Sequence, residues 1–268
     1  MVKIIAEIGW NHMGDMELAK KMISSAALNG ANIAKFQTWS ESDLISGPWD
    51  NDGRREIYKK AELSEKDHFE LKNECENSGV EFLTSVFNTK HIKFLQTLNM
   101  NLIKIPSHEI YNTDLIEHAG SKFNFVLLSV GACTYQELIR AVELVPKEKL
   151  ILMHCVSSYP LAPENVNLPK IDKLKTLSNI LGYSGHLTGI EDAIAAICKG
   201  ATFIEKHFTI DQNLPGRDNK NAILPKDLKN LSEFRDIFDK MNTDKGLDVQ
   251  EVELDIFNNY RGRWINKN

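Results

Sequence analysis

The sequence predicts a single-domain α/β protein folded as a (β/α)8 barrel, and three observations support this fold class. Short apolar segments recur eight times along the 268 residues, and longer amphipathic segments separate them. Most of the short segments are continuous apolar runs rather than alternating ones, which is typical of parallel strands buried on both faces. A barrel of this kind commonly takes about 250 residues as one domain. A doubly wound open sheet, with two strands misassigned, is the alternative.

The strands are expected at the short apolar segments, which are rich in Val, Ile, Leu and Phe. The expected strands are 3–8, 32–38, 81–86, 102–105, 125–130, 150–155, 181–184 and 202–206.

Helical periodicity fills the segments between the strands. A first helix is expected before the stop signal Asn29-Gly30. Ser64 and Asp67 form a capping-box pattern that opens a second helix, which should end near Gly79. Further helices are expected at about 90–98, 113–119, 135–145, 170–177, 191–199 and 225–241.

Two segments depart from this alternation. The longest irregular stretch is 39–63, which carries Arg54 and Arg55, and a loop of this length is often a lid or a binding loop. The C-terminal segment predicts a short acidic helix followed by a basic end. We therefore expect a barrel domain over residues 1–245 and a helical tail over 246–268.

Composition and charge narrow the class of protein. The net charge is −5 and no Lys/Arg-rich block stands out, so no nucleic-acid partner is expected. The first apolar run is short and reaches Glu7 at once, so neither a signal peptide nor a membrane anchor is expected, and the predicted location is cytoplasmic. Scattered cysteines without a CxxC pair predict buried free thiols in a reducing compartment. They are Cys75, Cys133, Cys155 and Cys198.

Polar residues close all eight predicted strands. Singly, each has an ordinary explanation as a turn residue, a helix cap or a paired interior lysine. Together they predict an active site, because barrel enzymes carry their chemistry at the carboxyl ends of the strands. In strand order they are Glu7, Asn11 and His12; Lys35 and Gln37; Thr84 and Ser85; Lys104, Ser107 and Glu109; Ser129; His154, Ser157 and Tyr159; Ser184 and His186; and Glu205, Lys206 and His207.

The types of these residues indicate the ligand. Two lysines with several hydroxyls suit a phosphorylated and carboxylated molecule. His186 and His207 follow neighbouring strands, which lie about 5 Å apart, so both imidazoles could bind one metal ion with open positions for water and substrate. The same pair could be an acid/base couple, or one ring could be a buried core residue.

Six motifs, in this order, resemble the sialic acid synthase (N-acetylneuraminate synthase) family over about residues 3 to 240. The motifs are Ala6-Glu7-Ile8-Gly9 with Asn11-His12, Ala34-Lys35-Phe36-Gln37-Thr38, Lys104-Ile105-Pro106-Ser107 with Glu109, His154-Cys155 with Ser157 to Pro160, Gly182-Tyr183-Ser184-Gly185-His186, and Ile204-Glu205-Lys206-His207-Phe208-Thr209.

The resemblance implies a (β/α)8 barrel that condenses phosphoenolpyruvate with an N-acyl hexosamine or a similar aldose. It implies a nonulosonic acid and phosphate as products, and a divalent cation, Mn or Mg, as cofactor. It also implies a role for each matching residue. Glu7 is the expected acid/base, Glu109 and Asp218 are acidic residues on the sugar and water side, and His186 and His207 are the metal ligands. The expected phosphate contacts are Lys35, Ser85, Ser107 and Ser129, those at the carboxylate end are Lys104, Ser157, Tyr159 and Ser184, and Gln37 is a further substrate contact.

This chain also departs from the family pattern. Members typically carry a C-terminal antifreeze-like domain that lends an arginine to the partner's sugar site, whereas the resemblance here covers the barrel only. A homodimer, or a separate chain that supplies the antifreeze-like domain, is therefore the expected protein partner. Gly185 stands where an acidic residue is common, Ser157 where some members have Asn, and Ser85 where some have Thr.

Two other classes of function remain open from the residues. A Schiff-base aldolase could use Lys35 or Lys104, because a desolvated barrel lysine is a suitable nucleophile. A non-catalytic barrel could bind a sugar phosphate or act as a scaffold in surface-polysaccharide synthesis.

Overall fold

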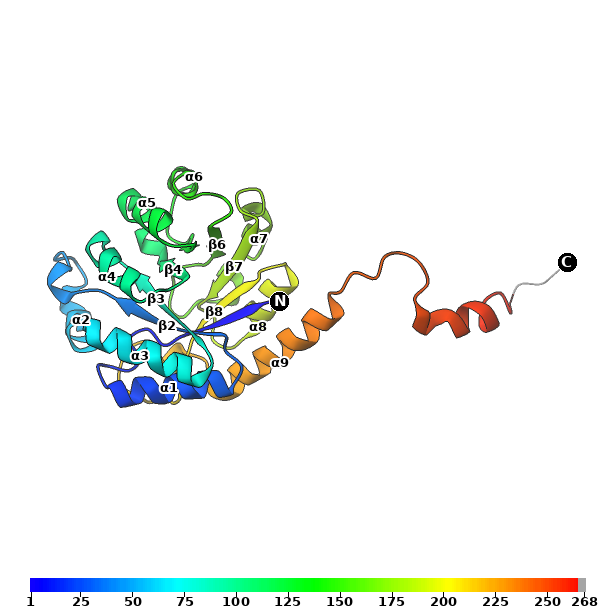
Figure 1. The fold of residues 1–268 in the computed structure, drawn as a ribbon, viewed down its shortest axis with the longest axis horizontal. Helices are drawn as coiled ribbons and strands as arrows, with labels where there is room; N and C mark the ends of the chain where they lie inside the picture. Colours follow the sequence, from blue (N-terminus) through cyan, green and yellow to red (C-terminus); the bar gives the residue numbers. More distant parts are fainter. Residues whose placement is uncertain (265–268) are drawn as a thin grey trace.

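The computed structural model describes residues 1–264 and contains a closed barrel of parallel strands (Figure 1). The strands follow one another in chain order, and β8 pairs with β1 to close the barrel. This closure excludes the open sheet, and each predicted strand end lies within one residue of the observed end. The strands are β1 (Lys3–Glu7), β2 (Ile33–Thr38), β3 (Glu81–Val86), β4 (Leu102–Ile105), β5 (Phe125–Ser129), β6 (Leu150–His154), β7 (Ile180–Gly185) and β8 (Phe203–His207).

Helices surround the barrel and cover its outer face (Figure 1). The predicted capping box is present at the start of the third helix, and Gly79 ends that helix in the left-handed conformation. The helices are α1 (Met16–Leu28), α2 (Arg54–Ala61), α3 (Glu65–Ser78), α4 (Ile92–Thr97), α5 (Thr113–Lys122), α6 (Tyr135–Glu143), α7 (Pro169–Leu174), α8 (Glu191–Cys198) and α9 (Pro225–Met241).

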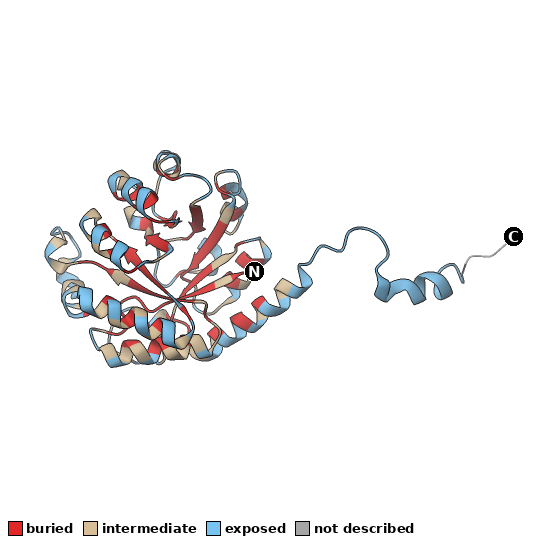
Figure 2. Ribbon diagram, in the orientation of Figure 1, coloured by how far each residue is buried: buried red, intermediate tan, exposed pale blue. Residues whose placement is uncertain are grey.

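Side-chain alternation divides each strand between two environments. Residues such as Ala34 and Phe36 belong to the large apolar core between barrel and helices. Ile33 belongs to a separate apolar cluster, formed by alternate strand positions, with Ile5, Leu83, Leu102, Leu127, Ile151 and Met153. Two residues further along the strands, the same alternation brings polar side chains such as Lys35 to the side of the strands that carries Ile33. The strands are accordingly buried along most of their length (Figure 2).

The prediction of an irregular stretch over 39–63 is wrong for its second half. Residues 54–61 form α2, whose Tyr58 packs against Trp10 and Trp39 with ring centroids 5.0 and 5.2 Å away. These aromatic residues follow β1 and β2, so the helix is stabilised by contacts that are distant in sequence. Its own sequence carries few apolar residues, which explains why periodicity did not indicate it.

Two further expectations concern the cysteines and the membrane. The cysteines are free, as predicted, but Cys198 is exposed and Cys133 only half-buried, so the prediction of four buried thiols is wrong for these two. Cys198 ends α8 and Cys133 lies between β5 and α6, and the spacing of the cysteines in the sequence did not indicate these positions. Among residues 1–264, no helix has the length and apolar character needed to cross a membrane.

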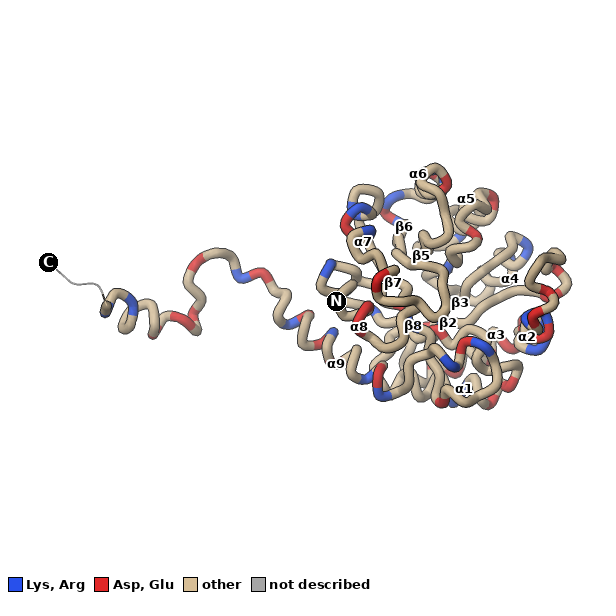
Figure 3. The backbone as a smooth tube through the Cα atoms, turned by 180° about the vertical axis from the view of Figure 1, so that it is seen from behind, with Lys and Arg blue, Asp and Glu red and all other residues tan. Residues whose placement is uncertain are grey.

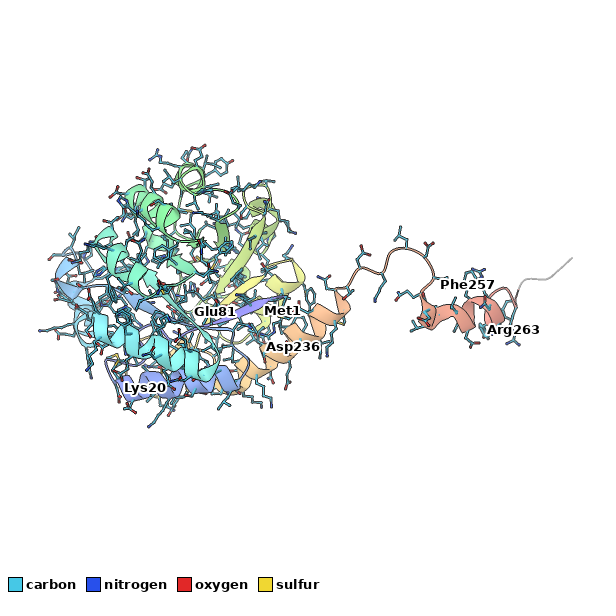
Figure 4. The ribbon with its side chains drawn as sticks, in the orientation of Figure 1. Met1, Lys20, Glu81, Asp236, Phe257 and Arg263 are labelled. Atoms are coloured by element: carbon cyan, nitrogen blue, oxygen red, sulfur yellow. The ribbon has the colours of Figure 1, made fainter. Side chains whose placement is uncertain are left out.

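The tail leaves the barrel after α9 (Figure 1). Residues 242–264 are exposed, and 251–260 form one continuous helical segment, which begins with the turn Glu251–Glu253 and ends with Ile256–Tyr260. Phe257 and Arg263 lie on this tail, away from the packed side chains of the barrel (Figure 4). A short helical segment that carries acidic residues is therefore present at 251–260, as predicted, and the last four residues of the expected tail lie outside the described chain.

Candidate active site

Glu205 on β8 links both predicted site lysines. Its carboxylate accepts hydrogen bonds from Lys104 Nζ at 3.1 and 2.9 Å, and Lys35 Nζ lies 3.5 Å from its Oε1. The Ser184 hydroxyl donates to the same oxygen at 3.0 Å. The two lysines and Glu205 are buried, with exposures of 2–4%. This cluster therefore forms a nearly desolvated charged layer on the inner side of the barrel.

Glu7 completes this layer from β1. Its Oε2 lies 2.8 Å from Lys35 Nζ, and Gln37 Nε2 donates to its Oε1 at 2.6 Å. Lys35 also donates to the Ser85 hydroxyl at 2.9 Å. The register that pairs Glu7 with Lys35 and Gln37 with Ser85 follows from the parallel pairing of β1, β2 and β3. The structure thus brings together four of the predicted site residues.

Burial and pairing set the charges of this layer. Burial raises the pKa of Glu7, although Lys35 opposes the shift. Burial alone would raise the pKa of Glu205 too, but Lys104 and Lys35 outweigh it and lower that pKa to about 2. Burial would lower the pKa of Lys35, but the carboxylates of Glu205 and Glu7 raise it, whereas burial lowers the pKa of Lys104. The two lysines are therefore balanced by carboxylates already present in the protein.

Three serines lie at the ends of β4, β5 and β6. The hydroxyls of Ser107 and Ser157 lie 2.7 Å apart. Ser129 is buried, and its hydroxyl has no hydrogen-bond partner within residues 1–264. A buried hydroxyl without a partner is costly, so a ligand oxygen is a reasonable partner for Ser129.

The two predicted metal histidines lie side by side. Their ring centroids are 5.7 Å apart, and the Tyr159 ring lies 4.1 Å from that of His186. His186 Nδ1 lies 2.6 Å from the carbonyl oxygen of Val156, so this nitrogen carries the proton and Nε2 keeps its lone pair. Burial lowers the pKa of His186 to about 3, so the ring is neutral at ordinary pH. This donor set fits a metal ligand.

Asp218 approaches His207 from the segment between β8 and α9. Its Oδ2 lies 3.4 Å from His207 Nδ1. A small pocket opens here, lined by Tyr159, Gly185, His186, His207, Asp218 and Asn221. Within residues 1–264, no three or more His, Cys, Asp or Glu side chains gather as a metal cluster. The two imidazoles are thus the predicted metal ligands that the described structure brings together, with the Asp218 carboxylate beside one of them.

A larger cavity of about 310 Å³ lies before β4 and β5, lined by residues that include Asn99, Asn101 and Lys122. These residues precede the amino ends of the strands. Barrel enzymes place their chemistry at the carboxyl ends, so volume does not locate the active site here.

Several polar residues that close the strands bond to other parts of the described chain and make no contact with the buried charged layer. The His154 ring lies 2.8 Å from the Val166 carbonyl, and Thr84 bonds to Thr38. Asn11 donates to the carbonyl of Phe208. Glu109 is half-buried and accepts a hydrogen bond from Asn112 at 3.0 Å, but within the described chain it pairs with no other predicted site residue.

Lys206 also lies apart from the site. Its Nζ lies 3.1 Å from Asp192 Oδ1, and both side chains are buried. Tyr183 donates to the same carboxylate at 2.9 Å, and Lys206 donates to the Leu187 carbonyl at 2.6 Å. This second charged cluster therefore holds the segment that directly follows His186.

Glu205 is the site residue to which sequence reasoning assigned no role. Its spacing from His207 offered a signal, because residues two apart in a strand share a face. Its partner Lys104 is 101 positions away in the sequence, so only the closed barrel reveals the pairing.

An eight-stranded parallel barrel with buried lysines, carboxylates and a histidine pair at its strand ends defines the class of (β/α)8-barrel enzymes. The NeuB family model matches residues 22–245, and the chain belongs to the NeuB family. The chain is 36% identical to the N,N'-diacetyllegionaminic acid synthase of Legionella pneumophila, with 85% of this chain and 69% of that protein covered.

Two other relatives agree with this assignment. The N-acetylneuraminate-9-phosphate synthase of Drosophila melanogaster is 36% identical, with 86% of this chain and 66% of that protein covered. The crystal structure of the N-acetylneuraminic acid (sialic acid) synthetase from Leptospira borgpetersenii superposes with a TM-score of 0.89 at 34% identity, over 99% of this chain and 93% of that chain. The family resemblance and the fold class predicted from the sequence are thus confirmed.

Proposed function

We propose that this protein condenses phosphoenolpyruvate with an aldose, such as N-acetylmannosamine or a related hexosamine, to give a nonulosonic acid and phosphate. The observation that carries the proposal is the buried layer in which Lys35 and Lys104 share Glu205, next to the paired rings of His186 and His207. The family membership supports a condensing synthase in general.

The charged layer supports binding of a phosphate and a carboxylate. Lys35 with Ser85, Ser107 and Ser129 would hold the phosphate, and Lys104 with Ser157 and Ser184 the carboxylate end. Because Glu205 and Glu7 already balance the two lysines, the lysines offset less of the ligand's charge than their number indicates.

His186 and His207 are the residues that would hold a divalent cation, Mn or Mg. When bound there, such a cation would supply Lewis-acid activation of the aldehyde. Tyr159 packs against the His186 ring, and the Val156 carbonyl fixes which nitrogen of that ring faces a ligand. Asp218, whose Oδ2 lies 3.4 Å from His207 Nδ1, would contact the sugar or a water molecule.

The reaction joins C3 of phosphoenolpyruvate to the aldehyde carbon and leaves positive character at C2. Glu7 would stabilise this charge and accept a proton from the water that adds to C2. Collapse of the adduct breaks the bond between C2 and the bridging oxygen, and phosphate leaves with that oxygen. Gln37 holds the Glu7 carboxylate in place, and Glu109 would contact the sugar hydroxyls.

Release of phosphate from phosphoenolpyruvate tests the proposal. The assay contains Mn²⁺ and one aldose from a panel of N-acetylmannosamine, mannose and diacetamido hexoses, each free and 6-phosphorylated, and parallel reactions contain EDTA. Release that needs both the metal and one of the aldoses supports the synthase and identifies the acceptor. Binding of phosphoenolpyruvate without release for any aldose would contradict it and favour a non-catalytic barrel.

A Schiff-base aldolase is the second candidate, because burial lowers the pKa of Lys104. The two hydrogen bonds from Lys104 to Glu205 oppose this role, since they occupy the amine. Borohydride treatment with a keto acid separates the two candidates. The aldolase would be trapped covalently on Lys104, whereas the synthase would remain unmodified.

A further inference from the structure

Arg54 and Arg217 converge on a single oxygen atom. Arg54 Nη2 lies 3.1 Å and Arg217 Nη1 lies 2.9 Å from Oδ2 of Asp52. Arg54 is the first residue of α2, and Arg217 lies in the segment between β8 and α9. Two guanidinium groups from segments far apart in the sequence thus meet at one carboxylate.

In this arrangement two guanidinium groups share one carboxylate, and the Arg54 guanidinium also lies over the Trp49 ring, 4.2 Å from its centroid. Asp52 offers one negative charge to two guanidinium groups, and the buried Arg54 Nε has no hydrogen-bond partner in the described residues. Arg55, the next residue of α2, differs, because it pairs with Glu41 at 2.5 Å and with Asp50 at 3.5 Å. Figure 3 shows Lys/Arg and Asp/Glu interleaved around α2, so charges of both signs are mixed on this part of the surface.

The pair also lies on the side of the site assigned to the sugar. Arg217 directly precedes Asp218, which lines the pocket beside His186 and His207. From α2, Tyr58 packs on Trp10, three residues after Glu7 in the sequence. The Arg54–Arg217 pair therefore joins the segment carrying Asp218 to the segment that covers the end of β1.

We propose that Arg54 and Arg217 bind a phosphomonoester at the end of the acceptor aldose remote from its aldehyde. This inference rests on the proposed condensation and names its acceptor as a phosphorylated sugar. Guanidinium groups bind phosphate through paired hydrogen bonds, and Asp52 Oδ2 lies where one phosphate oxygen would be shared by both. The relatives do not decide between the two acceptors, since the Drosophila protein is named as a synthase of a phosphorylated product and the Legionella protein is not.

The experiment compares N-acetylmannosamine 6-phosphate with N-acetylmannosamine as acceptors, with phosphoenolpyruvate and Mn²⁺. The quantity is the ratio of kcat/KM for the phosphorylated sugar to that for the free sugar. We expect a ratio well above one, and a fall of about tenfold to a hundredfold in Arg54→Gln and in Arg217→Gln, as for the loss of one charge-assisted hydrogen bond. Arg55→Gln is the matched control and should keep the ratio of the unaltered protein.

Other results overturn the inference. A ratio of one or less in the unaltered protein, or an unchanged ratio in both variants, would show that the pair does not recognise phosphate. Turnover of the free sugar alone would leave the condensation intact while removing the phosphorylated acceptor. If neither sugar is turned over, calorimetry with the protein loaded with phosphoenolpyruvate gives the dissociation constant of each sugar. Equal dissociation constants for the phosphorylated and the free sugar count against the inference.

Discussion

The carboxylate of Glu205 accepts two hydrogen bonds from the ammonium group of Lys104, at 3.1 and 2.9 Å, although the two residues lie on opposite sides of the strand order, on β8 and β4. A buried charge pair of this kind contributes little net stability, but removal of one partner leaves the other charge desolvated. Lys35 is a second cation that depends on the same carboxylate. The charge of Glu205 is therefore expected to be essential for the folded apo protein.

Glu205→Gln should lower the free energy of unfolding by roughly 3–5 kcal/mol, because it leaves two buried lysines with one carboxylate between them. Urea denaturation at neutral pH measures the loss. The matched control is Glu81→Gln, which removes an exposed partner of Lys3 and should cost less than about 1 kcal/mol. Phosphoenolpyruvate should restore part of the lost stability, since it supplies the missing negative charge. Equal losses in the two variants would contradict this account of the layer.

Glu7→Gln should reduce kcat by about 10²–10⁴-fold, as expected for loss of a general acid or base. The affinity for phosphoenolpyruvate should stay equal or increase, because Lys35 loses a competing carboxylate 2.8 Å away. Steady-state kinetics with calorimetry separates these two effects. Turnover within threefold of that of the Glu81→Gln control would remove Glu7 from the chemistry.

Stability should fall between pH 7 and pH 5 partly because of His12. Burial lowers the pKa of His12 to about 4 in the folded protein, whereas an unfolded chain takes up the proton near 6.5. The contribution of neutral His12 to the free energy of unfolding is therefore fully present above about pH 6.5 and is lost as the pH falls toward 4. His12→Gln should reduce the drop in unfolding free energy between pH 7 and pH 5 by about 2 kcal/mol.

His118→Gln serves as the control for this measurement, because the His118 side chain is 51% exposed. Denaturation curves at the two pH values give the comparison. A pH dependence that is the same in His12→Gln and in the control would show that His12 is not held neutral by the fold.

The carboxylate introduced by Gly185→Asp should be able to replace the carboxylate of Asp192. A Cβ at position 185 would collide with the Asp192 carboxylate and lie 2.7 Å from the Tyr183 ring. Gly185→Asp alone should destabilise the protein by about 1–3 kcal/mol through overpacking, and Asp192→Ala alone should leave Lys206 without its partner. The double variant should be more stable than either single variant.

Thermal unfolding of the three variants measures this compensation. Gly47→Ala is the control for a glycine substitution, since nothing lies within 4 Å of a Cβ there. Additive losses in the double variant would show that an acidic residue at position 185 cannot replace Asp192.

Sequence patterns predicted the strands well because each strand places a local apolar run in a buried position. Positions two apart then carry the site residues, so Glu7, Lys35, Ser85 and His207 could be predicted from the strand ends alone. The α2 helix could not, because Trp10 and Trp39 stabilise it from other loops. The role of Glu205 also depended on barrel closure.

The formation of a carbon–carbon bond tests the central claim most directly. Phosphoenolpyruvate labelled with ¹³C at C3 and an accepted aldose labelled with ¹³C at C1 are incubated with the protein and Mn²⁺. The account predicts a one-bond ¹³C–¹³C coupling in the product, together with one phosphate released for each coupled pair. Label that appears only in the methyl group of pyruvate, without coupling to the sugar carbon, would contradict it.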